Sequence, residues 1–366
     1  MQIDFHHSVT YVLSRLAGFD HAQANTIAHS AQYVDDATNA GLILFENGGL
    51  FSRISSAHKM LDYRNFRKLA NYQVWIPFHF LPGNDGLPAG EDPEGKFIHK
   101  LICRPNSHVA QAMVTEAILN HHKSSGLYRL GITMHVYADT WAHQGFAGVN
   151  HRVNEADDLV DENGEIDSEF NQRLNKYFRK NFLEQLAGAL IGDAFPLGHG
   201  AVLSNPDKPF LKWGYKDGLG RQVERDNPRD FLEAAENMYI WLQRYRLKDP
   251  TAEVSGLPTG DRELIAQMIA TIRDNDSHAR HEKWLASIRE GKFSFGTAEV
   301  PYISKGRGSW KYEALKTEKA IDTGKERFPY NSTFLQSDWK LFHDALKAHR
   351  LYIVDELLPQ FGICVA

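Results

Sequence analysis

The chain has 366 residues, a length that allows one large domain or two to three smaller ones. Hydrophobic residues make up 42% and charged residues 24%, as in ordinary globular proteins, so wholesale disorder is excluded. Acidic residues slightly outnumber basic ones, for a net charge of −5, which argues against a general polyanion binder and against stable binding to nucleic acid. No apolar run is long enough to span a membrane, so we expect no transmembrane segment.

The N-terminus carries no basic segment followed by an apolar one, so the sequence predicts no signal peptide. We therefore expect a protein that is cytoplasmic as synthesised, and its secretion would need a signal-independent route. The two cysteines form no CxxC motif and no thiolate zinc framework. Histidine is frequent, with 18 residues. A chain rich in histidine and aspartate but poor in cysteine favours nitrogen and oxygen ligands if it binds a metal.

In chain order, the spacing of apolar residues predicts a mainly helical protein. We expect helices over residues 5–17, 21–36, 107–123, 127–144, 169–193, 229–247, 261–289 and 335–358. Asp20 is expected to cap the second helix, with Gln23 as its capping-box partner. Residues 37–105 predict loops and short helices, and residues 145–168 and 194–228 predict loops.

The predicted fold class is all-α, because the strand signal is weak throughout. Residues 1–290 are expected to form a helical metal-binding catalytic domain. Residues 291–366 are expected to form an irregular insertion and a C-terminal helix that pack on the same domain, with residues 291–332 as a lid or an extension.

The strongest chemical signal is the run His135-Val-Tyr-Ala-Asp139-Thr-Trp-Ala-His143. On a helix, a step of four residues turns by only about 40°, so these three side chains share one face. A rigid element that directs a row of nitrogen and oxygen ligands into one cavity suits a metal site. The alternative is a polar helix face with scattered histidines, but an apolar stripe lies next to that face.

Two further groups of candidate ligands lie near the N-terminus. The segment Asp4-Phe5-His6-His7 offers His6 or His7, and its alternative role is an exposed polar cluster. Asp35 and Asp36 end the predicted helix 21–36, where two carboxylates oppose the helix dipole unless a cation offsets them. We therefore predict that Asp35 and Asp36 are catalytic, and that Asp36 also binds metal.

Other histidines extend this set. His79 lies between aromatic residues and is either a core histidine or a ligand in an apolar cleft. His199 lies between glycines that let a ligand approach the backbone, which suggests a substrate-binding role. His151 and Glu155 form an HxxxE pair that binds metal if its loop becomes helical.

The quoted motifs resemble a known superfamily. The runs AQYVDDATNAG, WIPFHFLPGN and MHVYADTWAHQGF are similar to the zinc-dependent phospholipases C and single-strand-specific zinc nucleases, and within that superfamily to bacterial zinc metallophospholipases C. The resemblance covers residues 1–215. It implies two or three zinc ions and places metal ligands at His6 or His7, Asp36, His79, His135, Asp139, His143, His151 and Glu155.

The chain departs from the usual pattern of that superfamily in three places, one of which is that the HxxxE pair comes closer to the main motif than usual. The mature enzymes usually begin with Trp, whose amine binds zinc, whereas this chain begins Met-Gln-Ile-Asp. The third histidine follows the first after eight residues here, where ten are usual.

The leading hypothesis is a zinc-dependent phosphodiesterase of phospholipase C type that acts on glycerophospholipids, with the membrane surface as a partner. The aromatic side chains Trp75, Phe78 and Trp141 would line an apolar slot for the substrate, unless they belong to the core. The first alternative is a nuclease or nucleotidase on the same scaffold, which would need a basic cleft. The second is a non-enzymatic, metal-stabilised helical interaction protein, whose metal would have no open position.

Overall fold

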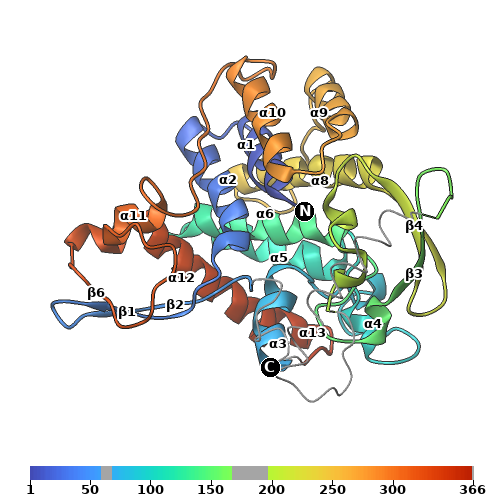
Figure 1. Ribbon diagram of the computed structural model, residues 1–366, viewed down its shortest axis with the longest axis horizontal. Coiled ribbons are helices and arrows are strands. Elements are labelled where there is room, and N and C mark those ends of the chain that lie inside the picture. Colours follow the sequence, from blue (N-terminus) through green and yellow to red (C-terminus); the bar gives the residue numbers. More distant parts are fainter. Residues whose placement is uncertain (59–67, 167–196, 365–366) are drawn as a thin grey trace.

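The computed structural model describes residues 1–58, 68–166 and 197–364 of the chain (Figure 1). The predicted helix 169–193 lies outside the described residues. The α-helices within the described ranges are α1 (Thr10–Leu16), α2 (His21–Asp36), α3 (Lys68–Phe78), α4 (Ile98–Leu101), α5 (His108–Leu119), α6 (Gly126–Ala142), α8 (Asn227–Leu247), α9 (Thr259–Thr271), α10 (Ser277–Arg289), α11 (Trp310–Leu315), α12 (Asp338–Leu351) and α13 (Leu358–Gln360).

Shorter or tighter helices connect them. Two are π-helical, η1 (Asp4–Val9) and η8 (Tyr352–Leu357), and both run directly into α-helices. The others are single 3-10 turns: η3 (Asn84–Gly86), η4 (Arg152–Asn154), η5 (Gly200–Val202), η6 (Asn205–Asp207) and η7 (Ser332–Gln336).

The all-α prediction is wrong, because the described residues include six strands in two three-stranded sheets and the fold is mixed α and β. In the first sheet, β1 (Gly41–Phe45) pairs antiparallel with β2 (Leu50–Arg53) and parallel with β6 (Arg327–Phe328). In the second sheet, β4 (Lys212–Asp217) lies between β3 (Ala156–Val160) and β5 (Gln222–Asp226), antiparallel to both. The strands lie inside the predicted loops 37–105, 145–168, 194–228 and 291–332.

Several predicted helix boundaries are confirmed. Asp20 caps α2 and Gln23 completes the capping box, and Ser107 caps α5. The predicted helix 5–17 is η1 followed by α1, and it ends before Gly18, whose φ is +89°. The predicted helix 261–289 is broken into α9 and α10 between Thr271 and Ser277.

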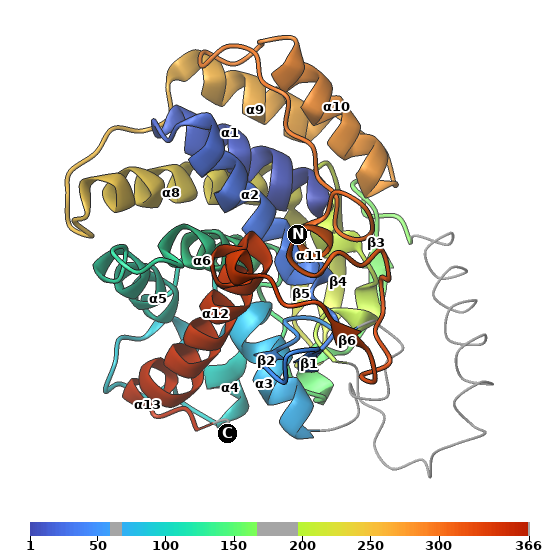
Figure 2. The ribbon, with the colours of Figure 1, turned by 90° about the vertical axis from the view of Figure 1, so that its left-hand side faces the viewer.

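Helix α6 is the centre of the main hydrophobic core, and nearly all of its residues are buried. It packs against α2, α5, α8 and α12. Helices α9 and α10 lie at one end of the molecule and α12 and α13 at the other, with α1, α2 and α6 between them (Figure 2). Because α6 is buried on all sides, the polar side chains on it need partners within the protein.

A second core lies between the first sheet, α11 and α12, and a third lies beside β4. The C-terminal residues 353–363 contribute to the main core. None of the helices in the described part of the chain is long and apolar enough to cross a membrane.

Candidate metal centre

Helix α6 carries the central residues of the site. His135 and Asp139 lie one turn apart on it, and His143 is the residue that ends it. His135 and Asp139 are at most 1% exposed and His143 is 4% exposed. The spacing in the sequence therefore places all three side chains along one buried face of the helix.

Helix α2 brings a carboxylate to this face. Gly131 allows its close approach, because a Cβ atom at that position would lie 2.3 Å from the Ile27 carbonyl oxygen. The contact brings the Ala31 carbonyl oxygen within 2.8 Å of Nδ1 of His135. One turn further along α2, Oδ1 of Asp35 lies 3.9 Å from Nε2 of His135.

Four histidines of the site share one arrangement. Each has one ring nitrogen at hydrogen-bond distance from a main-chain carbonyl oxygen, which can only accept, so that nitrogen carries the proton. The other ring nitrogen of each points toward carboxylates of the site. The pairs are His79 Nε2 with the Ser56 oxygen at 2.9 Å, His135 Nδ1 with the Ala31 oxygen at 2.8 Å, His143 Nδ1 with the His79 oxygen at 2.7 Å, and His199 Nδ1 with the Leu203 oxygen at 2.6 Å.

The first group of ligand atoms contains Nδ1 of His79, Nε2 of His135 and Oδ2 of Asp139. The two nitrogens are 3.3 Å apart, and they lie 3.4 Å and 3.3 Å from the carboxylate oxygen, respectively. Two ligands bound tetrahedrally to zinc at 2.0–2.1 Å are about 3.3–3.4 Å apart. The three distances therefore match the edges of a zinc-sized tetrahedron.

A second group lies beside the C-terminal end of α6 and contains His143, His199 and Asp207. Nε2 of His143 lies 3.4 Å from one oxygen of Asp207, and Nε2 of His199 lies 3.5 Å from the other. Asp207 lies in η6, whose backbone is joined to α8 through the amide of Asn227. His199, predicted as a substrate-binding residue, thus lies among the candidate ligands.

A third group contains His6, Asp35 and His135. The ring of His6 stacks on that of His135, with 3.7 Å between the centroids. Nε2 of His6 lies 3.2 Å from Oδ1 of Asp139, yet neither ring nitrogen of this buried histidine makes a hydrogen bond. The amine of Met1 lies beside the group, 2.5 Å from Asp139 and 3.1 Å from Asp207.

The electrostatics of the site favour the neutral forms of His6, His135 and His199 and the charged forms of Asp139 and Asp207. Burial lowers the pKa values of His6, His135 and His199 to about 4. Burial alone would raise the pKa of Asp139, but the surrounding histidines and the Met1 amine hold it well below its usual value. Burial would lower the pKa of the Met1 amine, but Asp139 and Asp207 raise it to about 11.

These residues fit a bound divalent cation. Since the outer nitrogen of each ring faces a main-chain carbonyl, Nδ1 of His79 and Nε2 of His135 face each other and Oδ2 of Asp139 with no donor between them in the neutral rings. Three carboxylates, Asp35, Asp139 and Asp207, lie together, and the Met1 amine is the one positive group within 4 Å of them among the described residues. Buried acceptors without donors are costly, and a metal would satisfy them.

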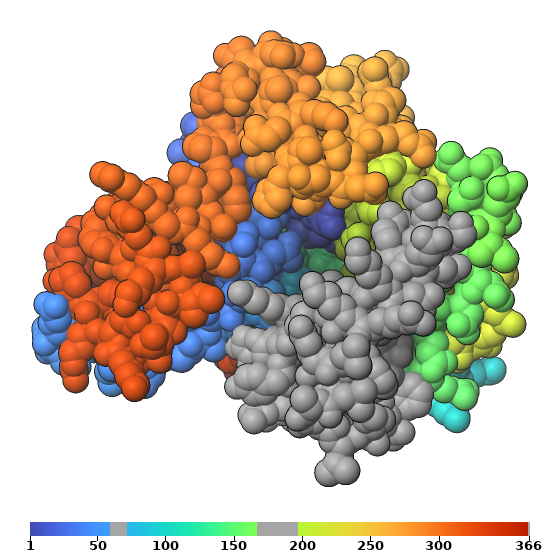
Figure 3. All heavy atoms as spheres, viewed as in Figure 1, coloured from blue at the N-terminus to red at the C-terminus, as the bar shows by residue number. Residues whose placement is uncertain are grey.

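A cavity of about 620 Å³ lies beside the centre, between Gln2 and Ile3, α2, α10 and residues 299–304. The surface is hollowed next to α10, and residues of the N-terminal elements lie at its floor (Figure 3). Asp35 lines this cavity and also belongs to the third group. Its surroundings raise the pKa of its carboxyl group, mainly because burial disfavours the charged form.

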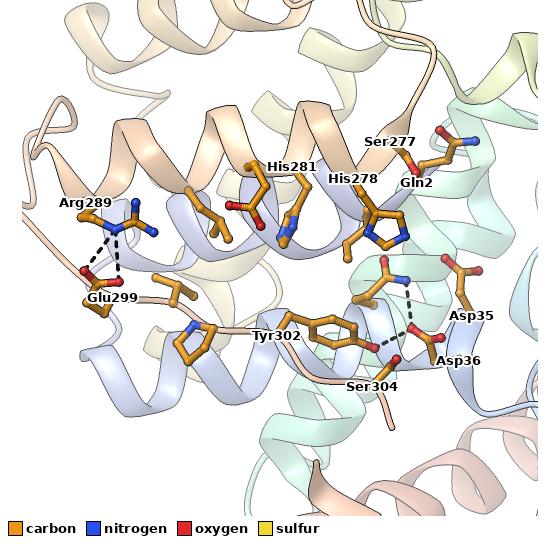
Figure 4. A pocket seen from close by; sticks show the side chains of 16 residues that line it. Gln2, Asp35, Asp36, Ser277, His278, His281, Arg289, Glu299, Tyr302 and Ser304 are labelled. Atoms are coloured by element: carbon orange, nitrogen blue, oxygen red, sulfur yellow. Dashed lines mark hydrogen bonds and ion pairs between the residues drawn. The ribbon is translucent and has the colours of Figure 1, made fainter. Parts of the chain in front are cut away.

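The walls of the cavity are polar and rich in carboxylates. Figure 4 shows Asp35 and Asp36 at one end and Arg289 paired with Glu299 at the other. The Tyr302 hydroxyl donates to Oδ2 of Asp36 over 2.7 Å, and Nε2 of Gln32 donates to the same oxygen over 3.3 Å.

The structure does not bring Asp36 or His7 to the candidate ligand groups. Asp36 is held by Tyr302 and Gln32, and its neighbour Asp35 faces the histidines instead. His7 points to the other side of η1, where its Nδ1 lies 2.9 Å from Nε2 of His281. Adjacent helical residues point about 100° apart, so only one of each pair can face the centre.

His151 and Glu155 also lie outside the candidate ligand groups. The loop does not become an α-helix: His151 precedes the 3-10 turn η4, and its Nδ1 accepts a hydrogen bond from the backbone of Val153. The pair thus lacks the helical spacing that its prediction required.

The three aromatic residues predicted to line a substrate slot do not lie together in one slot. Phe78 and Trp141 are 0% and 1% exposed and belong to hydrophobic cores. Trp75 is half-buried, and its ring lies 5.1 Å from that of His79. Trp75 is therefore the one member of this set that borders the centre.

Asp207 is the ligand candidate that the sequence prediction missed. It follows His199 by eight residues, but the segment between them forms short 3-10 turns and no α-helix, so no helical pattern marks it. The available signal was indirect, since Asp207 is the first acidic residue after His199.

The chain matches a family of unknown function, DUF6765, over residues 1–357. The protein belongs to this family. No curated protein and no solved structure matches the chain.

Proposed function

We propose that the protein is a zinc-dependent phosphodiester hydrolase of phospholipase C type. The observation that carries the proposal is the set of histidines whose N–H groups face main-chain carbonyls while their free nitrogens face shared carboxylates. This pairing is typical of metal-binding histidines, because the outer hydrogen bond sets the tautomer and orients the ring. The 3.3–3.4 Å triangle of His79, His135 and Asp139 has the size that a small divalent cation such as zinc requires.

The residues that would hold two or three zinc ions are His6, Asp35, His79, His135, Asp139, His143, His199 and Asp207. Bound zinc supplies Lewis acidity, which neutralises phosphoryl oxygens and makes a strong nucleophile available at neutral pH. Asp139 contacts the first group through Oδ2 and the Met1 amine and His6 through Oδ1. It would therefore link neighbouring metal positions.

The chain itself supplies a proton acceptor and a substrate cavity. Asp35 is the most exposed carboxylate of the three ligand groups, with 34% of its side chain exposed against 1% for Asp139 and 11% for Asp207. It lies where the cavity meets the centre, so it can accept a proton from an attacking water molecule.

The charge of the cavity favours a phospholipid over a nucleic acid. Asp35, Asp36, Glu282 and Glu299 line it against one arginine, Arg289, among the described lining residues. Burial also lowers the pKa of His281 to about 4, so this histidine adds no positive charge at neutral pH. A polyanion would be repelled, whereas a phosphodiester with one neutral or cationic alcohol would not.

The cavity also bears on the non-enzymatic alternative. A purely structural zinc site is closed, whereas a catalytic site keeps a position open to substrate. Here a space large enough for a small molecule reaches Asp35. This supports catalysis over a metal that only stabilises the fold.

Hydrolysis by the zinc-loaded full chain tests the proposal, with phosphatidylcholine vesicles and single-stranded DNA as parallel substrates. We expect release of phosphocholine from the vesicles. Asp139→Asn should lower this rate by at least about 100-fold, since even outer hydrogen-bond partners of metal ligands account for 10- to 100-fold. His151→Asn is the matched control, because His151 lies outside the ligand groups, and it should retain the wild-type rate.

Two results would contradict the proposal. Cleavage of the DNA alone would identify a nuclease. Cleavage of neither substrate by zinc-loaded protein would leave a non-catalytic zinc site as the better account.

A further inference from the structure

Arg280 of α10 is a buried cation far from the candidate ligands in sequence. The side chain of Arg280 is 0% exposed and that of Asp4 is 2% exposed. Nε and Nη2 of Arg280 donate to the two oxygens of Asp4 over 2.6 Å and 3.1 Å. Nη2 also donates to Oε1 of Gln2 over 2.6 Å, and Nη1 donates to the Asp274 carbonyl over 2.7 Å.

This network joins α10 to the start of η1, which it contacts closely. No side chain caps the N-terminus of η1. The bonds of Arg280 to Gln2 and Asp4, together with those of the Met1 amine to Asp139 and Asp207, fix the first residues. His6 follows Asp4 by two residues and needs such support, because neither of its ring nitrogens is hydrogen-bonded. Its position beside Asp139 therefore depends on where the backbone of η1 is held.

A fully buried ion pair is an inefficient way to gain stability, since the desolvation of both charges offsets most of their attraction. Such pairs can instead select one arrangement of the elements that they join. The arginine fork suits this purpose, because its planar donors fix both the direction and the distance of Asp4.

Resting on the proposed function, we propose that Arg280 is a positioning residue of the metal centre, which acts through Asp4 and Gln2 to hold His6 against Asp139. Arg280 itself lies in none of the ligand groups. Its effect on metal binding is therefore transmitted by the backbone of η1.

The test is zinc affinity, measured by competition with a chelator on the full-length chain. We expect Arg280→Met to weaken zinc binding by about 10-fold or more, as substitutions behind metal ligands do. Arg280→Lys should lose less zinc affinity than Arg280→Met, because lysine keeps the positive charge next to Asp4 although it lacks the planar pair of guanidinium donors. Asp4→Asn should weaken binding in the same direction.

Lys311→Met is the matched control. Lys311 is a buried cation bonded to Asp322 and to the Lys319 carbonyl, each over 2.7 Å, and it belongs to α11, outside the ligand groups. Its loss should lower the free energy of unfolding without changing zinc affinity. A general loss of stability in Arg280→Met is thereby separated from a specific loss of metal binding.

A double-mutant cycle with His6→Ala completes the test. If Arg280 acts through His6, Arg280→Met should have little further effect on zinc affinity once His6 is removed. Additive losses, or equal zinc affinity in Arg280→Met and Lys311→Met, would overturn the positioning role. Zinc binding without hydrolysis in the wild type would refute the proposed function alone, whereas a wild type that binds no zinc would overturn both.

Discussion

The partners of the second ring nitrogen separate His79 and His135 from the core residue His349. In His349, Nδ1 accepts from Nε of Arg129 over 3.1 Å and Nε2 donates to the Pro77 carbonyl over 2.9 Å, so both nitrogens are satisfied by the protein. In His79 and His135, one nitrogen donates to a carbonyl and the other meets only acceptors and another free nitrogen. Residue type and burial are the same in both cases, and only the partners differ.

The sequence marked His135, Asp139 and His143 by their regular spacing, whereas it left His6 and His79 with a second interpretation. The four-residue spacing of His135, Asp139 and His143 was sufficient to predict that the three side chains share one face of a helix. The choice between Asp35 and Asp36 was not decidable from spacing, because it depends on the rotation of α2 about its axis against α6.

His29 gives a prediction about pH at this scale. Burial lowers its pKa to about 3, from about 6.5 in the unfolded chain, so the unfolded chain binds more protons below pH 6.5. The free energy of unfolding, as far as His29 determines it, is therefore highest above pH 6.5 and falls as the pH decreases toward 3. His29→Phe keeps the stacking on Trp310 and removes the titration.

Urea unfolding of the metal-free protein at pH 7 and pH 5 measures this effect. The loss of stability between the two pH values should be about 2 kcal/mol smaller in His29→Phe than in the wild type. His122→Gln, at an exposed position, should follow the wild type. Equal losses in all three proteins would show that His29 does not titrate as its burial requires.

At the scale of elements, the helices were predictable and the strands were not. Caps and apolar periodicity are local, so Asp20 and Gln23 mark the start of α2. The strand β6 has two residues and pairs with β1, some 280 positions earlier in the chain. β3 carries two charged residues of five and β5 carries three, so their strand state depends on pairing with β4 and not on their own composition.

The contact between α2 and α6 gives a prediction at this scale. In Gly131→Ala, the new methyl group would lie 2.3 Å from the Ile27 carbonyl and 2.6 Å from Cβ of Ser30, so the helices must separate. We expect the free energy of unfolding to fall by about 1–3 kcal/mol, as for other overpacked sites. Zinc affinity should fall as well, because the same contact holds Asp35 near His135.

Gly260→Ala is the control for that variant. Gly260 lies in α9, and a Cβ atom there would meet nothing within 4 Å, so alanine should leave stability unchanged or raise it by up to about 1 kcal/mol. Urea unfolding compares the two variants. Equal stability of Gly131→Ala and the wild type would contradict the close packing of α2 on α6.

At the scale of the whole molecule, the centre gathers segments from distant parts of the chain. η1, α2, the end of α3, α6 and residues 199–207 supply its ligands, and α10 covers it. The sequence identified most of these segments one at a time. Which of them meet was not predictable, since it depends on long-range packing around α6 that no local pattern records.

The central claim is that these segments form a zinc centre. Elemental analysis of the purified full-length chain, after incubation with zinc and exhaustive dialysis, tests it most directly. The account predicts two or three zinc ions per chain, with fewer in His135→Ala and an unchanged number in His151→Asn. A wild-type chain that retains no zinc would contradict the claim, and with it the proposed hydrolysis.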